Sequence, residues 1–234
     1  MDLSQIDIAG IAFQLIAFLF AISVHESAHA WMANRCGDPT AQLLGRITLN
    51  PAKHIDPIGT VLMPLIALVT HFPVIGWAKP TPVDPRNFKN PVKDDILTAV
   101  VGPISNFLIA SCTVVLMFLI AKTSETGHGL VQTMPISYRL GVAGLGSTSF
   151  LVPVTVFLYD LMLINIVLGV FNLIPVPPLD GSHVLRHFLT DSVRRIYDTV
   201  GMFGLLALVY LGGNLLARLI TPFIRFYDGI LTRF

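Results

Sequence analysis

Long apolar runs separated by short polar stretches make up most of this chain. A helix needs about 20 mostly apolar residues to cross a bilayer. Four runs reach that length: Ile8 to Cys36, Ile96 to Ala121, Val154 to Ile174 and Val200 to Ile220. A fifth run, Ile58 to Val69, is shorter and contains Pro64, so it spans the membrane, re-enters it or lies at the interface. The pattern predicts an all-α multi-pass membrane protein with about four to five transmembrane helices.

Two polar stretches flank the fifth run. Gly37 to Pro57 and Phe72 to Asp95 are rich in proline, glycine, asparagine and aspartate, which favour turns and irregular backbone. We expect loops and short re-entrant or strand-like elements there. The sequence shows no internal repeat and no low-complexity tract, so we expect one membrane-embedded domain over residues 1–234.

The composition supports residence in a membrane. Hydrophobic residues make up 53% of the 234 residues, charged residues make up 12%, and the mean hydropathy is +0.72. Soluble domains carry about twice that charged fraction. The net charge of +1 gives no reason to expect a nucleic-acid partner, whereas the apolar runs predict contact with the lipid bilayer. Because only two cysteines occur, we expect no disulfide framework.

Basic residues are distributed unequally between the connecting segments. Six of them fall between the first run and the run that begins at Ile96: Arg46, Lys53, Lys79, Arg86, Lys89 and Lys93. Only Lys122 and Arg139 fall in the segment from Lys122 to Pro153. Since basic loops stay in the cytoplasm, the N-terminus is expected outside, provided that the fifth run does not cross. The first ten residues lack lysine and arginine, so we expect the first run to be retained rather than removed as a signal peptide.

The first run contains the motif His25-Glu26-Ser27-Ala28-His29. Side chains four residues apart lie on one face of a helix, so the two imidazoles can hold one zinc ion. Glu26 is offset by about 100° and can take a proton from a zinc-bound water without being a ligand. A charge at mid-bilayer costs roughly 2.5 kcal/mol or more, which favours this reading over hydrogen bonding between helices.

A catalytic zinc site normally has three protein ligands and one open position. The candidates for the third ligand are Asp180, Asp160, His54, His183 and Asp56. Asp180 is favoured because three prolines precede it at membrane depth, and broken backbone is tolerated there only beside protein or a wet cavity. The alternative is that Asp180 and Gly181 form a plain turn or helix cap. We therefore predict one zinc ion per chain, held by His25, His29 and Asp180.

Several segments together resemble the site-2 protease family of intramembrane metalloproteases, peptidase family M50. The first is the motif from His25 to His29, and the second is the N-x-x-P-x-P-x-L-D-G segment from Asn172 to Gly181. The supporting segments are Gly102 to Asn106, Leu44 to Pro51, His54 to Pro57 and Gly76 to Pro80. The last three look like the compact bacterial branch, which lacks PDZ and CBS domains.

The resemblance implies hydrolysis of a peptide bond within or near a transmembrane segment of a membrane protein or peptide. It implies a three-helix catalytic core, here about residues 8–190, followed by a C-terminal transmembrane helix at about 200–222. It also implies that Asn172 holds the substrate backbone in extended form. The expected location is the bacterial cytoplasmic membrane, with the active site nearer the cytoplasmic face.

Other polar residues leave alternatives open. Asn165 lies on one helical face with Asn172, and both could line a cavity. Asn165 is expected instead to hydrogen-bond a neighbouring helix, and Asp160 is given no role. His54 and Asp56 are expected to shape a loop. His183 and His187 form either a second metal pair or a solvated helix face.

Two further hypotheses follow from the sequence. The segment from Trp77 to Pro82 could offer an edge to which a substrate strand adds. The competing functions are a zinc transporter, which also places histidine and aspartate near broken helices, and an inactive homologue that serves as a scaffold.

Overall fold

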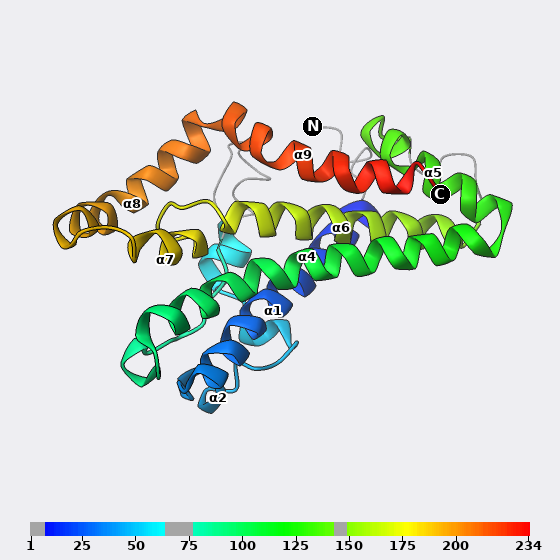
Figure 1. Ribbon diagram of the computed structural model, residues 1–234. Helices are drawn as coiled ribbons and strands as arrows, with labels where there is room; N and C mark the ends of the chain where they lie inside the picture. Colours follow the sequence, from blue (N-terminus) through cyan, green and yellow to red (C-terminus); the bar gives the residue numbers. More distant parts are fainter. Residues whose placement is uncertain (1–7, 64–76, 143–148) are drawn as a thin grey trace. The chain divides into compact units, whose positions relative to one another are not determined.

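The structure is a computed structural model that describes residues 8–63, 77–142 and 149–234. Its elements, in chain order, are α1 (Ile8–Cys36), α2 (Thr40–Leu43), η2 (Pro51–Lys53), η3 (Pro57–Leu62), η4 (Pro85–Asn87), α4 (Pro91–Thr123), α5 (Glu125–Arg139), α6 (Leu151–Asn172), α7 (Asp180–Arg186), α8 (Asp191–Leu211) and α9 (Gly213–Leu231) (Figure 1). The described residues contain no strand, so the prediction of an all-α multi-pass membrane protein is confirmed.

Within residues 8–63, 77–142 and 149–234, three helices, α1, α4 and α6, are long and apolar enough to cross a membrane. A fourth span is formed if α8 and α9 count together, and these two helices meet at an angle of 81°. Gly212 separates them, and its backbone N–H bonds to the carbonyl of Leu208. The predicted C-terminal helix at about 200–222 therefore covers the end of α8 and the start of α9, and is bent rather than straight.

The chain divides into two compact units, and α1, α4 and α6 contribute to both. The first unit contains Met1–Ala21, Phe107–Val167 and Ile220–Phe234. Large side chains fill its interior, among them the fully buried Met117, Tyr159 and Met162. Aromatic contacts join its segments, since the rings of Phe118 and Phe234 lie 4.9 Å apart.

Polar groups inside the first unit are paired. Asp228 on α9 accepts hydrogen bonds from Arg139 on α5 and, over 2.9 Å, from the hydroxyl of Tyr159 on α6. Asp160 accepts a hydrogen bond from Tyr138. A buried charge is tolerated in an apolar interior only when it is paired in this way.

The second unit contains Ile22–Asn106 and Leu168–Leu219. In its core, Ile174 and Leu179 from the proline-rich stretch pack on Leu205 of α8. A Cβ on Gly201 would lie only 2.4 Å from the Pro177 ring, so glycine lets α8 approach this stretch. The residues after α6 are thereby held against a helix although they form no regular element of their own.

The connection between α1 and α4 belongs to the second unit. Its described residues form short helical turns and irregular backbone, without the strand-like element that the sequence suggested. Residues 64–69 of the fifth apolar run lie outside the described residues. The described residues before and after this gap are in contact, since the N–H of Trp77 donates to the carbonyl of Gly59 over 3.2 Å.

Candidate metal centre

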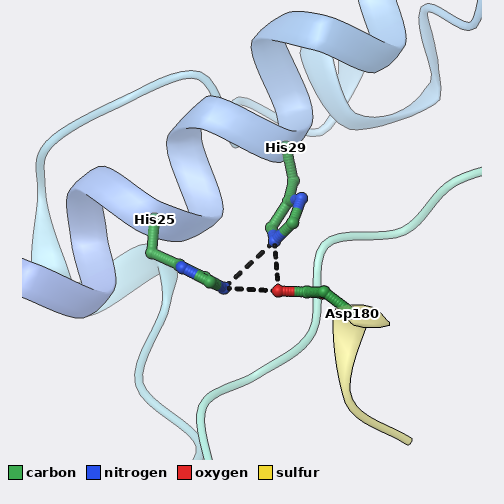
Figure 2. A group of neighbouring side chains, drawn as sticks. All are labelled: His25, His29 and Asp180. Atoms are coloured by element: carbon green, nitrogen blue, oxygen red, sulfur yellow. Dashed lines mark hydrogen bonds and ion pairs between the residues drawn. The ribbon is translucent and has the colours of Figure 1, made fainter. Parts of the chain in front are cut away.

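Three side chains converge in the second unit (Figure 2). His25 and His29 project from one face of α1, one turn apart, and Asp180 is the first residue of α7. The Nε2 atoms of the two histidines lie 3.0 Å apart. Asp180 Oδ2 lies 3.2 Å from Nε2 of His25 and 3.4 Å from Nε2 of His29. Three potential ligand atoms therefore face one point.

Hydrogen bonds orient both imidazole rings. Nδ1 of His25 lies 2.7 Å from Oδ1 of Asn106, and Nδ1 of His29 lies 2.6 Å from the carbonyl oxygen of Thr98. Since both partners are oxygen acceptors, each Nδ1 carries the hydrogen. Each Nε2 then holds a lone pair directed at Asp180, which is the tautomer that binds a metal.

Gly102 on α4 makes room for the two histidines. A Cβ at this position would lie 2.3 Å from Nε2 of His29 and 2.8 Å from Cε1 of His25. Real Cβ atoms do not approach other atoms so closely, so a side chain would force the rings apart. The backbone of α4 thus forms one wall of the site.

The three residues fit a zinc ion. Histidine nitrogen and carboxylate oxygen are zinc ligands, and bonds of about 2.0–2.1 Å in a tetrahedron place ligand atoms about 3.3 Å apart. The observed separations of 3.0, 3.2 and 3.4 Å match that spacing. Oδ2 of Asp180 is also buried without a hydrogen-bond donor, and a buried polar atom needs a partner. A cation between the three atoms would supply one.

Asp180 is positioned by contacts on both sides of it. A Cβ on Gly181 would lie 2.2 Å from the carbonyl oxygen of Leu173, so glycine permits the tight return of the chain after α6. His183 on α7 and His187, the residue that follows this helix, both contact the carboxylate of Asp95 at the start of α4, at 3.1 and 2.7 Å. These contacts attach α7 to the helix that carries Gly102.

The other candidate ligands lie elsewhere among the described residues, where His25, His29 and Asp180 form the only such cluster. His54 bonds through Nε2 to the carbonyl of Thr48, and Asp56 caps η3 through the amides of Ile58 and Gly59. Both residues therefore shape the loop, as expected.

The two asparagines of α6 bond to their own helix. Nδ2 of Asn172 donates to the carbonyl of Leu168 over 3.1 Å, and Nδ2 of Asn165 donates to the carbonyl of Leu161 over 2.8 Å. The substrate-binding role of Asn172 stays a prediction.

Sequence reasoning assigned no role to Asn106, Thr98 or Thr81. Asn106 lies in the G-P-x-x-N motif, which could have drawn attention to it. The Thr98 contact uses a backbone carbonyl and therefore leaves no signal in the sequence. Thr81 donates to the carboxylate of Glu26, although 55 residues separate the two.

Comparison with known proteins identifies the family. The profile of peptidase family M50 matches residues 13–211. The chain belongs to this family. A relative from Bacillus subtilis, which carries the provisional name zinc metalloprotease YwhC, is 33% identical over 84% of this chain and 78% of its own length. No solved structure gives a significant match.

Two mycobacterial relatives also carry a provisional zinc metalloprotease name, Rip2. The protein from Mycolicibacterium smegmatis is 25% identical over 89% of this chain and 66% of its own length. The protein from Mycobacterium tuberculosis is 27% identical over 87% of this chain and 68% of its own length. Membership of M50, together with the apolar helices α1, α4 and α6, makes the chain an integral membrane protein.

Proposed function

We propose that this protein is an intramembrane zinc metalloprotease of the site-2 protease type, with one zinc ion per chain. The observation that carries the proposal is the convergence of Asp180, at 3.2 and 3.4 Å, on His25 and His29 of α1, a transmembrane helix that also carries Glu26. Two histidines and one carboxylate form a three-ligand set that leaves a fourth position open for water. The peptidase family and the names of the relatives support the same activity.

Each residue has a defined task in this proposal. Zinc, when bound, lowers the pKa of a water molecule and polarises the scissile carbonyl. Asn106 and the Thr98 carbonyl keep both imidazoles in the metal-binding tautomer. Glu26 accepts the proton of the attacking water and later passes it to the leaving amine.

The proposed substrate is a transmembrane protein or peptide, cleaved within or near its membrane segment. Two of the three ligands, His25 and His29, lie on the membrane-spanning helix α1, so a substrate reaches them most directly from the lipid bilayer. Asn172 is the last residue of another membrane-spanning helix, α6, and we assign it to the extended substrate backbone as the family resemblance implies.

The proposed location is the bacterial cytoplasmic membrane, with the N-terminus outside. In support, the end of α1 lies beside the segment just before α4, since the N–H of Lys89 donates to the carbonyl of Cys36 over 3.2 Å. Both ends then belong to the same side of the membrane, and the basic residues between them favour the cytoplasm. The metal ligands lie toward that end of α1, nearer the cytoplasmic face.

The test combines zinc content with cleavage in detergent micelles. Two probes are suitable: β-casein, and a quenched peptide whose apolar helix contains a central Asn-Pro pair that loosens it. We expect about one zinc per wild-type chain, and markedly weaker retention in Asp180→Ala. Glu26→Gln should keep its zinc and lose about 10²- to 10⁴-fold in kcat.

The competing functions give different results. A transporter would move zinc across vesicle membranes and would lose little on Glu26→Gln. An inactive scaffold would bind its partners without cleaving either probe. Wild-type protein that retains no zinc would overturn the proposal, as would equal zinc retention by Asp180→Ala.

A further inference from the structure

Thr81 contacts the carboxylate of Glu26. The backbone N–H of Thr81 donates to Oε2 over 2.9 Å, and its hydroxyl lies 2.8 Å from the same oxygen. The hydroxyl is also 3.0 Å from the main-chain carbonyl oxygen of Glu26. Bonds to a carboxylate are about twice as strong as neutral ones, so this contact restrains the Glu26 side chain.

Arg46 holds the backbone next to Thr81. The guanidinium is buried, and its Nη2 donates to the carbonyls of Lys79 and Pro80, the latter over 2.9 Å. Its Nη1 donates to the carbonyl of Lys53. The planar guanidinium presents its donors in a rigid fork, so one side chain fixes two segments relative to each other.

Trp77 and Lys79, which precede Thr81, are hydrogen-bonded to residues 54–60. The hydroxyl of Thr60 donates to the carbonyl of Trp77 over 2.8 Å, and the N–H of Lys79 donates to the carbonyl of His54 over 2.9 Å. Thr81 therefore reaches Glu26 from a segment with several independent attachments. A loosely held loop residue would not restrain a carboxylate in this way.

The contact involves one of the two carboxylate oxygens. Within the part of the chain that the structure describes, Thr81 donates to Oε2, and no protein donor is recorded for Oε1. We infer that Thr81 is a positioning residue for Glu26, which holds Oε2 and leaves Oε1 to receive the proton of the attacking water. In that step one O–H bond of the water breaks and its proton moves to Oε1. The remaining oxygen bonds to the carbonyl carbon while the C=O π bond breaks, and that electron pair moves to the carbonyl oxygen. The inference rests on the proposed protease function.

The contact can be observed directly, because Glu26 and Glu125 are the only glutamates in the sequence. Cell-free synthesis with glutamate labelled with ¹³C at Cδ gives two labelled carboxylates, and Glu125→Gln leaves only Glu26. Isotope-edited infrared spectroscopy of the full chain then reports on that carboxylate. Thr81→Val should shift and broaden its antisymmetric stretch, while Thr81→Ser should restore the wild-type band. The substitution keeps the backbone N–H and removes the hydroxyl, so an unchanged band in Thr81→Val would overturn the hydroxyl contact.

Kinetics tests what the contact does. With zinc content equal to wild type, Thr81→Val should lower kcat on the quenched peptide or β-casein about tenfold, the effect of losing one hydrogen bond to a charged group, with little change in KM. Thr81→Ser should restore kcat. Thr60→Val is the matched control, because it removes an attachment of the same segment without touching Glu26.

The outcomes separate this inference from the proposed function. Wild-type kcat in Thr81→Val, or an equal loss in Thr60→Val, would overturn the positioning role while leaving the protease intact. A wild type that cleaves neither probe would overturn the proposed function, and the positioning role with it. If Thr81→Val fails to fold, the comparison of Thr81→Ser and Thr81→Ala, which differ by the hydroxyl, decides the question.

Discussion

At the scale of single residues, the site depends on one position where no side chain fits. The backbone of α4 at Gly102 lies so close to the imidazoles that a Cβ would stand 2.3 Å from Nε2 of His29. On the opposite side of each ring, Nδ1 of His25 is hydrogen-bonded to Asn106 and Nδ1 of His29 to the carbonyl of Thr98. The rings therefore have little freedom to move away from an added methyl group.

Gly102→Ala should consequently lose zinc. We expect zinc retention to fall at least about tenfold, the lower end of the range for damaged supporting shells of metal sites, with activity falling in parallel. Atomic absorption on detergent-purified protein measures the zinc content. Gly129→Ala is the matched control, since nothing lies within 4 Å of a Cβ there. Full zinc occupancy in Gly102→Ala would mean that α4 does not line the site.

At the scale of elements, the end of α1 is joined to the segment before α4 through Asp38. This fully buried carboxylate accepts hydrogen bonds from Thr40, from the N–H of Asp84 over 2.7 Å and from Asn87 over 2.9 Å. Burial acts to raise the pKa of Asp38, but the hydrogen bonds outweigh it and hold that pKa below its usual value.

This lowered pKa makes stability depend on pH. The unfolded chain binds the proton at its ordinary pKa, near 3.9, and the folded chain binds it only at lower pH. The stabilisation is therefore complete above about pH 4 and decreases as pH falls through the folded pKa. Asp38→Asn should lower the free energy of unfolding by about 1–3 kcal/mol at pH 7 and reduce the acid dependence of Tm. An unaltered acid profile in thermal unfolding would contradict this assignment.

At the scale of the whole molecule, contacts within the first unit place the C-terminal residues beside α5 and the end of α4. Nε2 of Gln132 on α5 donates to the carbonyl of Thr232 over 3.4 Å, and the ring of Phe234 packs on Phe118. Since α4 runs from the cytoplasm outwards in the proposed orientation, we expect the C-terminus outside, together with α5. The bent pair of α8 and α9 would then make one broken crossing.

Reporter fusions test this arrangement. Alkaline phosphatase, which is active only outside, should be active at the C-terminus and within residues 124–139, and a fluorescent protein at either place should stay dark. A fusion within residues 85–90 should give the reverse result. If the reporters at the C-terminus and within residues 124–139 both indicate the cytoplasm, the proposed orientation is inverted. If these two positions give opposite results, the packing of the first unit is contradicted.

The fold class and the candidate ligands were accessible from the sequence for local reasons. The length of an apolar run predicts a membrane helix, and α1 ends at the predicted residue, Cys36. The four-residue spacing of His25 and His29 places both on one helical face. The bend in the C-terminal segment could not be predicted in the same way, because the mean hydropathy of a run does not depend on whether its helix is straight or bent at Gly212.

What the sequence determined by itself was therefore the set of apolar helices and the pair of histidines, because both follow from periodicity along one helix. The sequence also favoured Asp180 as the third ligand, but only the tertiary structure brought it to that pair, placed Gly102 against the rings and put Thr81 on Glu26. These contacts join residues far apart in the chain, and they depend on how α4, α7 and the 77–81 segment pack on α1. Hydrogen bonds to backbone carbonyls, such as that of Thr98, carry no side-chain signature, so packing alone decides them.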